Sequence, residues 1–244
     1  DVSRPLIQHY EETRNFPAMD KTSKLSPHLR FGSVSVRKMV AKAEAESNKT
    51  FLKELIWREF FMQILWHFPH TINKSFRPKY DHIAWREPGS EFEAWCQGKT
   101  GYPIVDAGMR ELWTTGYMHN RARMIVASFL IKHLLIDWRR GEQWFWDTLV
   151  DADYGSNTVN WQWTAGSGVD ANMFVRIMAP LTQSPKFDSA GYIRRWVPEL
   201  AKLPDSAIHD PEAHGSRTAA YPPKIIGHRE ARERALAAYA KVKG

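Results

Sequence analysis

Apolar side chains in this sequence recur at steps of three and four residues, the spacing that places them on one face of an α-helix. In the clearest run, residues 50–68, the apolar positions are Phe51, Leu52, Leu55, Ile56, Phe60, Ile64 and Leu65. Pro69 follows the run and ends it. The two-residue alternation that marks a half-buried strand is almost absent. The pattern therefore predicts an all-α fold.

The same spacing returns along the rest of the chain. Helices are predicted over 35–46 with Ser35 as the cap, 106–113 before Gly116, 120–134, 142–150 and 229–243. Loops are predicted over 16–27, 73–89, 155–169 and 178–187, and an extended Pro/His/Ser-rich connection over 204–228. Composition changes nowhere sharply enough to divide the chain. We therefore expect residues 1–244 to form one domain, long enough for a real core.

Composition excludes several classes of protein. Hydrophobic residues make up 43% and charged residues 25%, values typical of a globular chain. The longest nearly apolar run, Met124 to Ile131, is too short to cross a bilayer, and no signal peptide is visible. The single cysteine, Cys96, excludes a disulfide framework and a multi-cysteine metal site. We expect a cytoplasmic protein with no membrane partner and no metal, and a monomer by default.

Charge and tryptophan content are unusual. Lys and Arg number 34 against 27 Asp and Glu, a net charge of +7, which favours a polyanionic partner such as nucleic acid. There are 11 tryptophans, about three to four times the average usage. Indole is flat and redox-active, and a core rarely needs so many. The surplus predicts a role beyond packing.

Hydroxyl groups gather near the N-terminus. Thr22, Ser23 and Ser26 follow Tyr10 and Arg14, and hydroxyls beside backbone N–H groups can cradle a pyrophosphate. Such clusters are more often turns and helix caps. No GxGxxG follows a strand, so a dinucleotide here would not be held by a Rossmann unit.

Two predicted helices carry polar groups at one-turn spacing. Glu54 and Trp57 share a face and could bind a flat heterocycle, although a surface ion pair beside a half-buried indole is the commoner case. Asn120 and Met124 also share a face, in a segment that carries Arg121 and Arg123. An amide can read a base edge and a guanidinium can hold phosphate, but a capped, solvated helix end is more frequent.

The densest polar cluster follows the helix predicted over 142–150. Asp151, Asp153 and Asn157 precede Trp161 and Trp163, and together they could bind a ribose, an adenine or the edge of an isoalloxazine. An Asp-x-Asp can also bind a divalent metal, but nothing nearby completes calcium-loop spacing.

Five segments carry a family resemblance. They are Leu25–Gly32, Glu54–Phe60, Gly101–Ala107, His119–Met124 and Asn160–Trp163. In this order and spacing they resemble the photolyase/cryptochrome family, with the nearest likeness to its class I cyclobutane pyrimidine dimer photolyases. The resemblance covers only the helical FAD-binding domain. The family's N-terminal α/β antenna domain would precede Asp1 and is absent from this sequence, so the antenna chromophore stays unknown.

The resemblance implies a role for each matching residue. The FAD phosphates and ribityl chain would be held by Tyr10, Arg14, Thr22, Ser23, Leu25 and Ser26. Asp151 and Asp153 would hold the sugar and adenine, and Asn157 would face flavin N5. The lesion pocket would be lined by Glu54, Trp57, Asn120, Met124 and Trp163. Electrons would pass along Trp161, Trp138 and Trp85. DNA phosphates would be met by Arg58, Arg77, Lys79, Arg121, Arg139, Lys186 and Arg194.

The implied function is light-driven repair of cyclobutane pyrimidine dimers in damaged DNA. Excited, fully reduced and anionic FAD would pass an electron to a dimer flipped out of the duplex or single strand, and the electron would return. Glu54 would donate a hydrogen bond to a base carbonyl, which requires a proton and hence a pKa raised by burial.

Three alternatives stay open. A cryptochrome-like photoreceptor keeps FAD and the tryptophans, although Asn157 argues against the plant type. A (6-4) photolyase would need paired histidines where His119 and Asn120 stand. A tryptophan-rich DNA-binding domain would carry no cofactor. The sequence also departs from the family at Met173, at Met178–Pro180, where Ala179 replaces an asparagine, and at Gly227.

Overall fold

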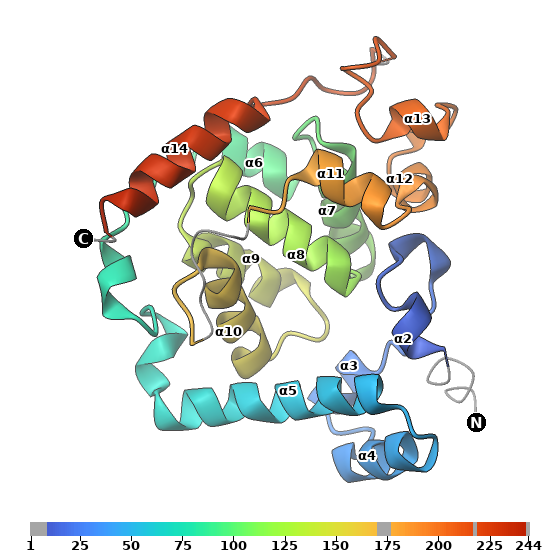
Figure 1. The fold of residues 1–244 in the computed structure, drawn as a ribbon, viewed down its shortest axis with the longest axis vertical. Helices are drawn as coiled ribbons and strands as arrows, with labels where there is room; N and C mark the ends of the chain where they lie inside the picture. The colour runs from blue at the N-terminus through green and yellow to red at the C-terminus, as the bar shows by residue number, and fades with distance from the viewer. Residues whose placement is uncertain (1–8, 170–176, 217–218, 243–244) are drawn as a thin grey trace.

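The computed structural model describes residues 9–169, 177–216 and 219–242, and the regular elements within them are helices (Figure 1). The α-helices are α2 (Tyr10–Thr13), α3 (Ser26–Arg30), α4 (Val36–Ala45), α5 (Lys49–His67), α6 (Ser90–Cys96), α7 (Pro103–Thr115), α8 (Asn120–Ser128), α9 (Trp138–Thr148), α10 (Tyr154–Ala165), α11 (Pro180–Lys186), α12 (Ala190–Trp196), α13 (Asp205–Ile208) and α14 (His228–Ala240). In these ranges there is no strand, and one isolated β-bridge pairs Arg86 with Ile136. The predicted all-α class is confirmed.

Shorter helical turns connect these elements. A π-helix, Phe129–His133, continues α8, and the 3-10 helices are Pro17–Met19, Pro69–Ile72, Pro78–His82 and Pro198–Leu200. Each 3-10 helix begins with proline, whose fixed φ suits a first helical position and which has no N–H to leave unpaired there.

The main core surrounds α7 and α8. Ile104, Leu112 and Ile125 on these helices are at most 1% exposed. Trp95 of α6 is fully buried beside them, and its Nε1 donates to the carbonyl of Val126 at 3.0 Å. This bond satisfies the one polar atom of a large apolar side chain, so the indole can be buried at little cost.

A second, smaller core joins α4 to α5. It consists of Met39, Ala43, Phe51 and Leu55. The helix α10 packs against α5 on one side and against α8 and α9 on the other, and Figure 1 shows α5 running along the edge of the molecule below α10. The boundary between the two cores therefore lies beside α10.

The predicted helix over 50–68 is α5. Its N-cap is Asn48, whose side chain accepts from the Phe51 N–H at 2.9 Å. Ser35 likewise holds the N-cap position of α4, but its side chain makes no capping hydrogen bond. Gly116 ends α7 with φ of 68°, a conformation that favours glycine.

Residues 155–165, expected in a loop, lie in α10, so this prediction is wrong. The Asp153 side chain caps the helix by accepting from the Ser156 N–H at 3.0 Å. The buried face carries Gln162, which accepts from the Phe76 N–H at 2.8 Å and donates to the Thr71 carbonyl at 2.7 Å. Polar side chains satisfied in this way fill a buried helix face that a search for apolar periodicity does not detect.

The loop predicted over 178–187 is also wrong, since residues 180–186 form α11. Pro180 stands at its first turn, a position that proline favours. The connection over 204–228 contains the one-turn helix α13 and otherwise turns, bends and irregular backbone where it is described, and its last residue, His228, begins α14. None of the helices in the described ranges combines the length and apolarity needed to cross a membrane.

Two histidines join the π-helix to α14. Nε2 of His133 lies 2.9 Å from Nδ1 of His228, and the His133 ring stacks on Phe129 at 4.8 Å between centroids. His133 is 1% exposed. Burial, with His228 and Arg234 as further causes, lowers the pKa of His133 to about 3. The folded protein therefore holds this imidazole neutral.

Acid should destabilise the fold through His133. Above about pH 6.5 the unfolded histidine is also neutral, so protonation of His133 takes nothing from the free energy of unfolding there. Below that pH the unfolded chain gains a proton that the folded chain cannot bind, so the free energy of unfolding should fall by up to about 1.4 kcal/mol per pH unit from this residue. The loss continues until the pH nears the folded value of about 3.

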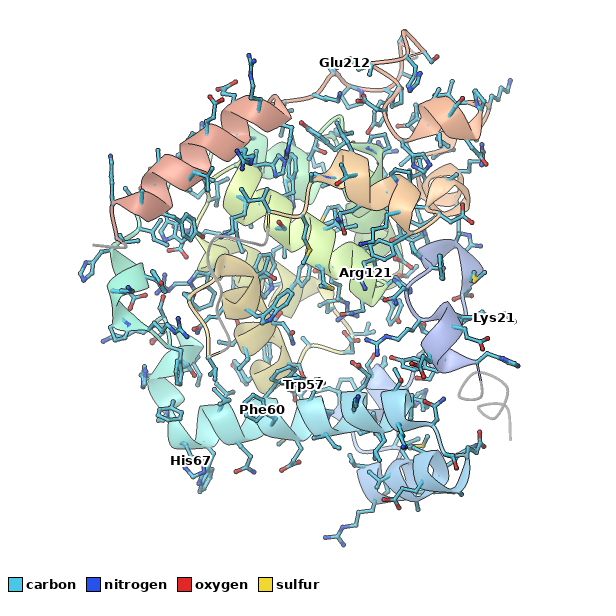
Figure 2. All side chains as sticks on the ribbon, viewed as in Figure 1. Lys21, Trp57, Phe60, His67, Arg121 and Glu212 are labelled. Atoms are coloured by element: carbon cyan, nitrogen blue, oxygen red, sulfur yellow. The ribbon has the colours of Figure 1, made fainter. Side chains whose placement is uncertain are left out.

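Urea unfolding at several pH values between 7.5 and 5 measures the effect. His133→Gln removes one titrating group and should make the acid slope shallower, and we expect the variant to be less stable at pH 7.5. Part of the slope should remain, because burial also lowers the pKa of His119 to about 4. His67→Gln, at the exposed end of α5 (Figure 2), is the matched control and should keep the wild-type slope. An acid slope in His133→Gln as steep as that of the wild type contradicts the assignment.

Candidate functional site

A cavity of about 680 Å³ opens where α5, α8 and α10 face the N-terminal segment that contains α2 and α3. Its volume lies within the roughly 300–1,000 Å³ of ligand sites. The lining contains every residue that the sequence assigned to the cofactor or to the lesion pocket: Tyr10, Arg14, Thr22, Ser23, Leu25, Ser26, Glu54, Trp57, Asn120, Met124, Asp151, Asp153, Asn157 and Trp163. The fold thus brings together residues from four distant segments.

One wall is built on an ion pair between Arg123 and Asp151. Nη2 of Arg123 lies 2.8 Å from Oδ2 of Asp151, and Nη1 lies 3.1 Å from Oδ1. The Asp151 side chain is 3% exposed, and its Oδ2 also accepts from the Ser26 hydroxyl at 2.6 Å. The carboxylate therefore ties α3, α8 and the turn before α10 into one wall.

Cations and hydroxyls gather at this end of the cavity. The Thr22 hydroxyl lies 3.3 Å from the Tyr117 hydroxyl, and the Arg123 guanidinium lies 5.4 Å from the Tyr117 ring centroid. Arg30 also lines the cavity and donates through Nε to the Ala152 carbonyl. Guanidinium and hydroxyl donors in this number suit a diphosphate.

The helix α10 contributes amide and carboxylate groups. The Asp153 carboxylate is oriented by the capping bond described above. Asn157 is 8% exposed and donates through Nδ2 to the Glu142 carbonyl at 3.0 Å. Its amide is thus fixed at the cavity wall by α9.

Arg14 and Glu54 form an ion pair across the cavity. The sequence assigned these residues to different tasks, the FAD phosphates and the lesion. It also expected Glu54 to be buried and protonated. In the structure the Glu54 side chain is 37% exposed and its partner is a cation, so the burial that this expectation required is not found.

An aromatic wall lies on α5. The Trp57 ring stacks on Phe61 at 5.8 Å with an interplanar angle of 25° and meets the edge of Phe60 at 5.5 Å. Trp57 is 47% exposed and lies on the side of α5 that faces α10, whereas His67 points away (Figure 2). A flat, accessible indole at a cavity mouth can stack on a planar ligand.

Asn120 and Met124, which were predicted to share a helix face, lie at the start of α8. Nδ2 of Asn120 lies 3.9 Å from Sδ of Met124, so the two side chains are adjacent. The Arg121 guanidinium lies 4.2 Å from the Phe187 ring centroid and donates to Oδ1 of Asn15 at 2.6 Å.

The three tryptophans expected to carry electrons differ in position. Trp161 lines the cavity and is 2% exposed, whereas Trp138, at 1%, and Trp85 do not line it. The ring of Trp85 meets the edge of Tyr239 at 6.2 Å. Their role as an electron chain stays a prediction.

The cations expected to meet DNA are spread over several elements. Arg58 and Arg121 line the cavity, whereas Arg77, Lys79 and Lys186 lie outside its lining. Arg139 is paired with Asp81 and Asp137, and Arg194 is paired with Asp205. The contact of all these cations with DNA stays a prediction.

The sequence analysis missed Arg30, Tyr117, Arg123 and Glu142 as site residues. The sequence could have identified Arg123, because this residue belongs to the segment His119–Met124. Two aspartates that could pair with it stand later in the chain, in the densest polar cluster. Glu142 had no such signal, since its contact with Asn157 depends on the packing of α9 on α10.

Among the described residues, no three His, Cys, Asp or Glu side chains gather as metal ligands would. Asp151 and Asp153 are oriented by Arg123 and by the Ser156 N–H instead. The donor set fits FAD better: guanidiniums and hydroxyls for the diphosphate, amide and carboxylate groups for polar edges, and apolar walls for the rings.

Two of the three departures from the family pattern lie at the starts of helices. Ala179 is the N-cap residue of α11, and the Met178 N–H donates to the Ser128 hydroxyl at 3.1 Å. Gly227 is the N-cap residue of α14. Met173 lies outside the described residues.

Comparison with known proteins gives one consistent result. The family described as the FAD binding domain of DNA photolyase matches residues 51–241. A deoxyribodipyrimidine photo-lyase of Agrobacterium fabrum is 52% identical over 97% of this chain and 53% of its own length. The chain therefore spans about half the length of this relative.

Two solved structures share the fold. A class III photolyase from Agrobacterium tumefaciens superposes with a TM-score of 0.91 at 51% identity, over 98% of this chain and 53% of its own. A cryptochrome from Synechocystis gives 0.87 at 36% identity, over 96% and 52%. The sequence motifs pointed to class I, whereas the Agrobacterium structure is described as class III.

Replacing Asp151 should loosen the cavity wall. Asp151→Asn removes the charge that faces Arg123, and breaking a buried ion pair costs about 3–5 kcal/mol. Because the Arg123 side chain is 25% exposed, we expect the low end, roughly 3 kcal/mol, in the free energy of unfolding by urea. Asp147→Asn, at an exposed position of α9, is the matched control. Equal stability of the two variants contradicts the role given to Asp151.

Proposed function

The chain belongs to the DNA photolyase/cryptochrome family, and we propose that it binds FAD in the cavity and, in the whole protein, repairs cyclobutane pyrimidine dimers in DNA under light. One observation carries the proposal. The residues assigned to the cofactor and those assigned to the lesion line a single cavity, so both ligands would meet there.

We place the cofactor at the part of the cavity whose wall contains Arg123. Thr22, Ser23 and Ser26 offer hydroxyls, Arg123 and Arg30 offer guanidiniums, and their partners hold them in place. When bound, reduced FAD supplies an electron under light and takes it back, so the protein has to place a dimer beside it without a net redox change.

The lesion end is the mouth formed by α5 and the start of α8. Trp57 is accessible there, and Trp163 also lines the cavity. Stacking on such side chains is worth about 1–3 kcal/mol per base, which offsets part of the few kcal/mol needed to take a base out of the duplex. Asn120 offers amide donors and acceptors to a base edge. Arg14 holds the Glu54 carboxylate in place beside them.

DNA would approach this mouth through basic side chains. Arg58 and Arg121 lie in the lining, and the net charge of +7 favours a polyanion. Binding of this kind weakens as salt releases counterions. Lys79, Lys186 and Arg77 are further candidates on the surrounding elements.

A photoreceptor is the second candidate, because the Synechocystis cryptochrome shares the fold at 36% identity. Both functions use FAD, so the lesion pocket distinguishes them. A photoreceptor has no need of an accessible Trp57 in the same cavity as Asn120 and Met124.

A repair assay tests the proposal. The flavin-loaded, chemically reduced protein is incubated with dimer-containing oligothymidine under blue light, and the thymine absorbance band is followed. Recovery of the band supports repair, and Trp57→Ala should reduce the rate and the affinity for the damaged strand. If flavin is bound and reduced but the absorbance stays constant, repair is excluded and the photoreceptor reading stands. A colourless protein that cannot be reconstituted with FAD overturns both.

The tryptophans outside the cavity lead to a separate prediction. Trp85→Phe or Trp138→Phe should block photoreduction of oxidised flavin, because phenylalanine is too hard to oxidise to serve as a donor. Repair after dithionite reduction should survive, since the repair electron starts on the flavin and returns to it. Packing loss should stay near 1–2 kcal/mol because both replacements keep an aromatic ring. Transient absorbance after a blue flash measures the yield. Wild-type yield in both variants contradicts the electron-chain assignment.

A further inference from the structure

Lys132 is a lysine buried inside the protein. It lies in the π-helix Phe129–His133 and is 2% exposed. Its Nζ donates to the Ala165 carbonyl at 2.9 Å and lies 3.8 Å from the centroid of the Tyr239 ring. The Tyr239 hydroxyl donates to the same carbonyl at 2.8 Å. Within the described ranges no carboxylate pairs with Lys132, and burial lowers its pKa to about 7.

The charge of Lys132 makes this position costly. A buried cation lowers stability unless carboxylates or several acceptors satisfy it. A methionine side chain has a similar length and carries no charge, and replacing buried charges by apolar side chains is often neutral or stabilising. Packing alone therefore does not account for a lysine at this position.

Tyr239 links Lys132 to one tryptophan of the predicted electron chain. The Tyr239 ring, in α14, meets the ring of Trp85 edge-on, with 6.2 Å between the centroids. Because the Lys132 Nζ lies 3.8 Å from the same Tyr239 centroid, the ammonium lies within about 10 Å of the Trp85 ring, a distance over which two charges inside a protein still interact. A charge on Lys132 therefore acts on a charge at Trp85.

The predicted electron chain ends at Trp85. Its first two members, Trp161 on α10 and Trp138 on α9, stand on helices that lie close together, since a Cβ built on Gly141 of α9 would lie 2.2 Å from the Trp161 ring. Each electron that moves inward leaves a positive hole that moves outward, so Trp85 ends as a radical cation. Among the described residues, none accepts a hydrogen bond from the buried Nε1 of Trp85, so no protein group is placed to take its proton. The positive charge therefore stays on the ring.

We propose that Lys132 governs this last step: while protonated, its ammonium disfavours the positive charge on Trp85, and as a neutral amine it no longer does. The inference rests on the proposed binding of FAD and on the electron chain. In the step itself one electron passes from Trp85 to the Trp138 radical cation. An added thiol reductant later returns one electron to Trp85, so the electrons balance.

The charged and titratable groups that face this corner come from several elements. They are Tyr239, His228 and Arg234 on α14, Tyr80 on the 3-10 helix Pro78–His82, Asp137 before α9 with its partner Arg139, and His133 on the π-helix itself. Phenol, carboxyl and guanidinium groups ordinarily titrate outside the range from about pH 6 to 8.5. Burial lowers the pKa of both histidines, to about 3 for His133. Over this range Lys132 is therefore the group at this corner whose charge changes.

Flash photoreduction of the flavin-loaded protein tests the proposal. Transient absorbance measures the yield of separated charge at about pH 6 and pH 8.5. Repulsion over this distance should make the hole on Trp85 about tenfold less favourable at the lower pH, so the wild-type yield should rise with pH. Lys132→Met should keep the high yield at both pH values. Lys132→Arg carries a charge that does not leave and should keep the low yield at both.

A control and a second measurement complete the design. Lys241→Met, at the exposed end of α14, is the matched control and should keep the wild-type rise with pH. Urea unfolding does not depend on photochemistry. As the pH falls from about 8.5 to 7, the wild-type unfolding constant should rise by up to about tenfold per pH unit, because the unfolded lysine binds a proton that the folded one does not. Lys132→Met should lose most of this rise.

The outcomes separate this inference from the proposed function. A wild-type chain that cannot be loaded with flavin overturns both. Photoreduction that survives Trp85→Phe overturns the electron chain and with it the role of Lys132, but leaves FAD binding and repair intact. If Trp85→Phe blocks photoreduction while Lys132→Met keeps the wild-type rise in yield, the role of Lys132 alone is overturned. An unchanged unfolding slope in Lys132→Met also overturns it, because the titrating group then lies elsewhere.

Discussion

The Arg123–Asp151 pair is the contact on which the cavity depends. Arg123 comes from the start of α8, Asp151 from the turn before α10, and Ser26 from α3, so one carboxylate joins segments more than a hundred residues apart in sequence. A buried carboxylate is stable only with charge-complementary and hydrogen-bonding partners. The pair and the Ser26 hydroxyl line the cavity, and these charged and hydroxyl groups suit a diphosphate.

The sequence predicts the fold well where one face of a helix is apolar. The helix α5 was predicted within one residue at each end, because its apolar residues keep helical spacing and Pro69 follows. The helix α10 was missed because its buried face carries Asn157, Thr158 and Gln162. These side chains are satisfied by partners on other elements, and no local pattern reveals such partners.

Most of the residues that line the site were predictable from the sequence, but the contacts between them were not. Family motifs identify which residues line the cavity, and the structure places all of them there. The pairing of Arg14 with Glu54 joins residues 40 positions apart, and that of Asn157 with Glu142 depends on the register of two helices. Spacing along one helix cannot supply either contact, because each is a property of tertiary packing.

Gly141 has a consequence for how this protein can change over evolution. Its bare Cα lets Trp161 fill the space beside α9, and Glu142 reaches Asn157 only because α9 lies that close. Any side chain at position 141 would push the two helices apart and lengthen a contact at the neighbouring residue. Selection on the chemistry of the cavity would therefore act on a residue with no side chain, and a compensating exchange would have to make room at both Trp161 and Leu130 in the same step.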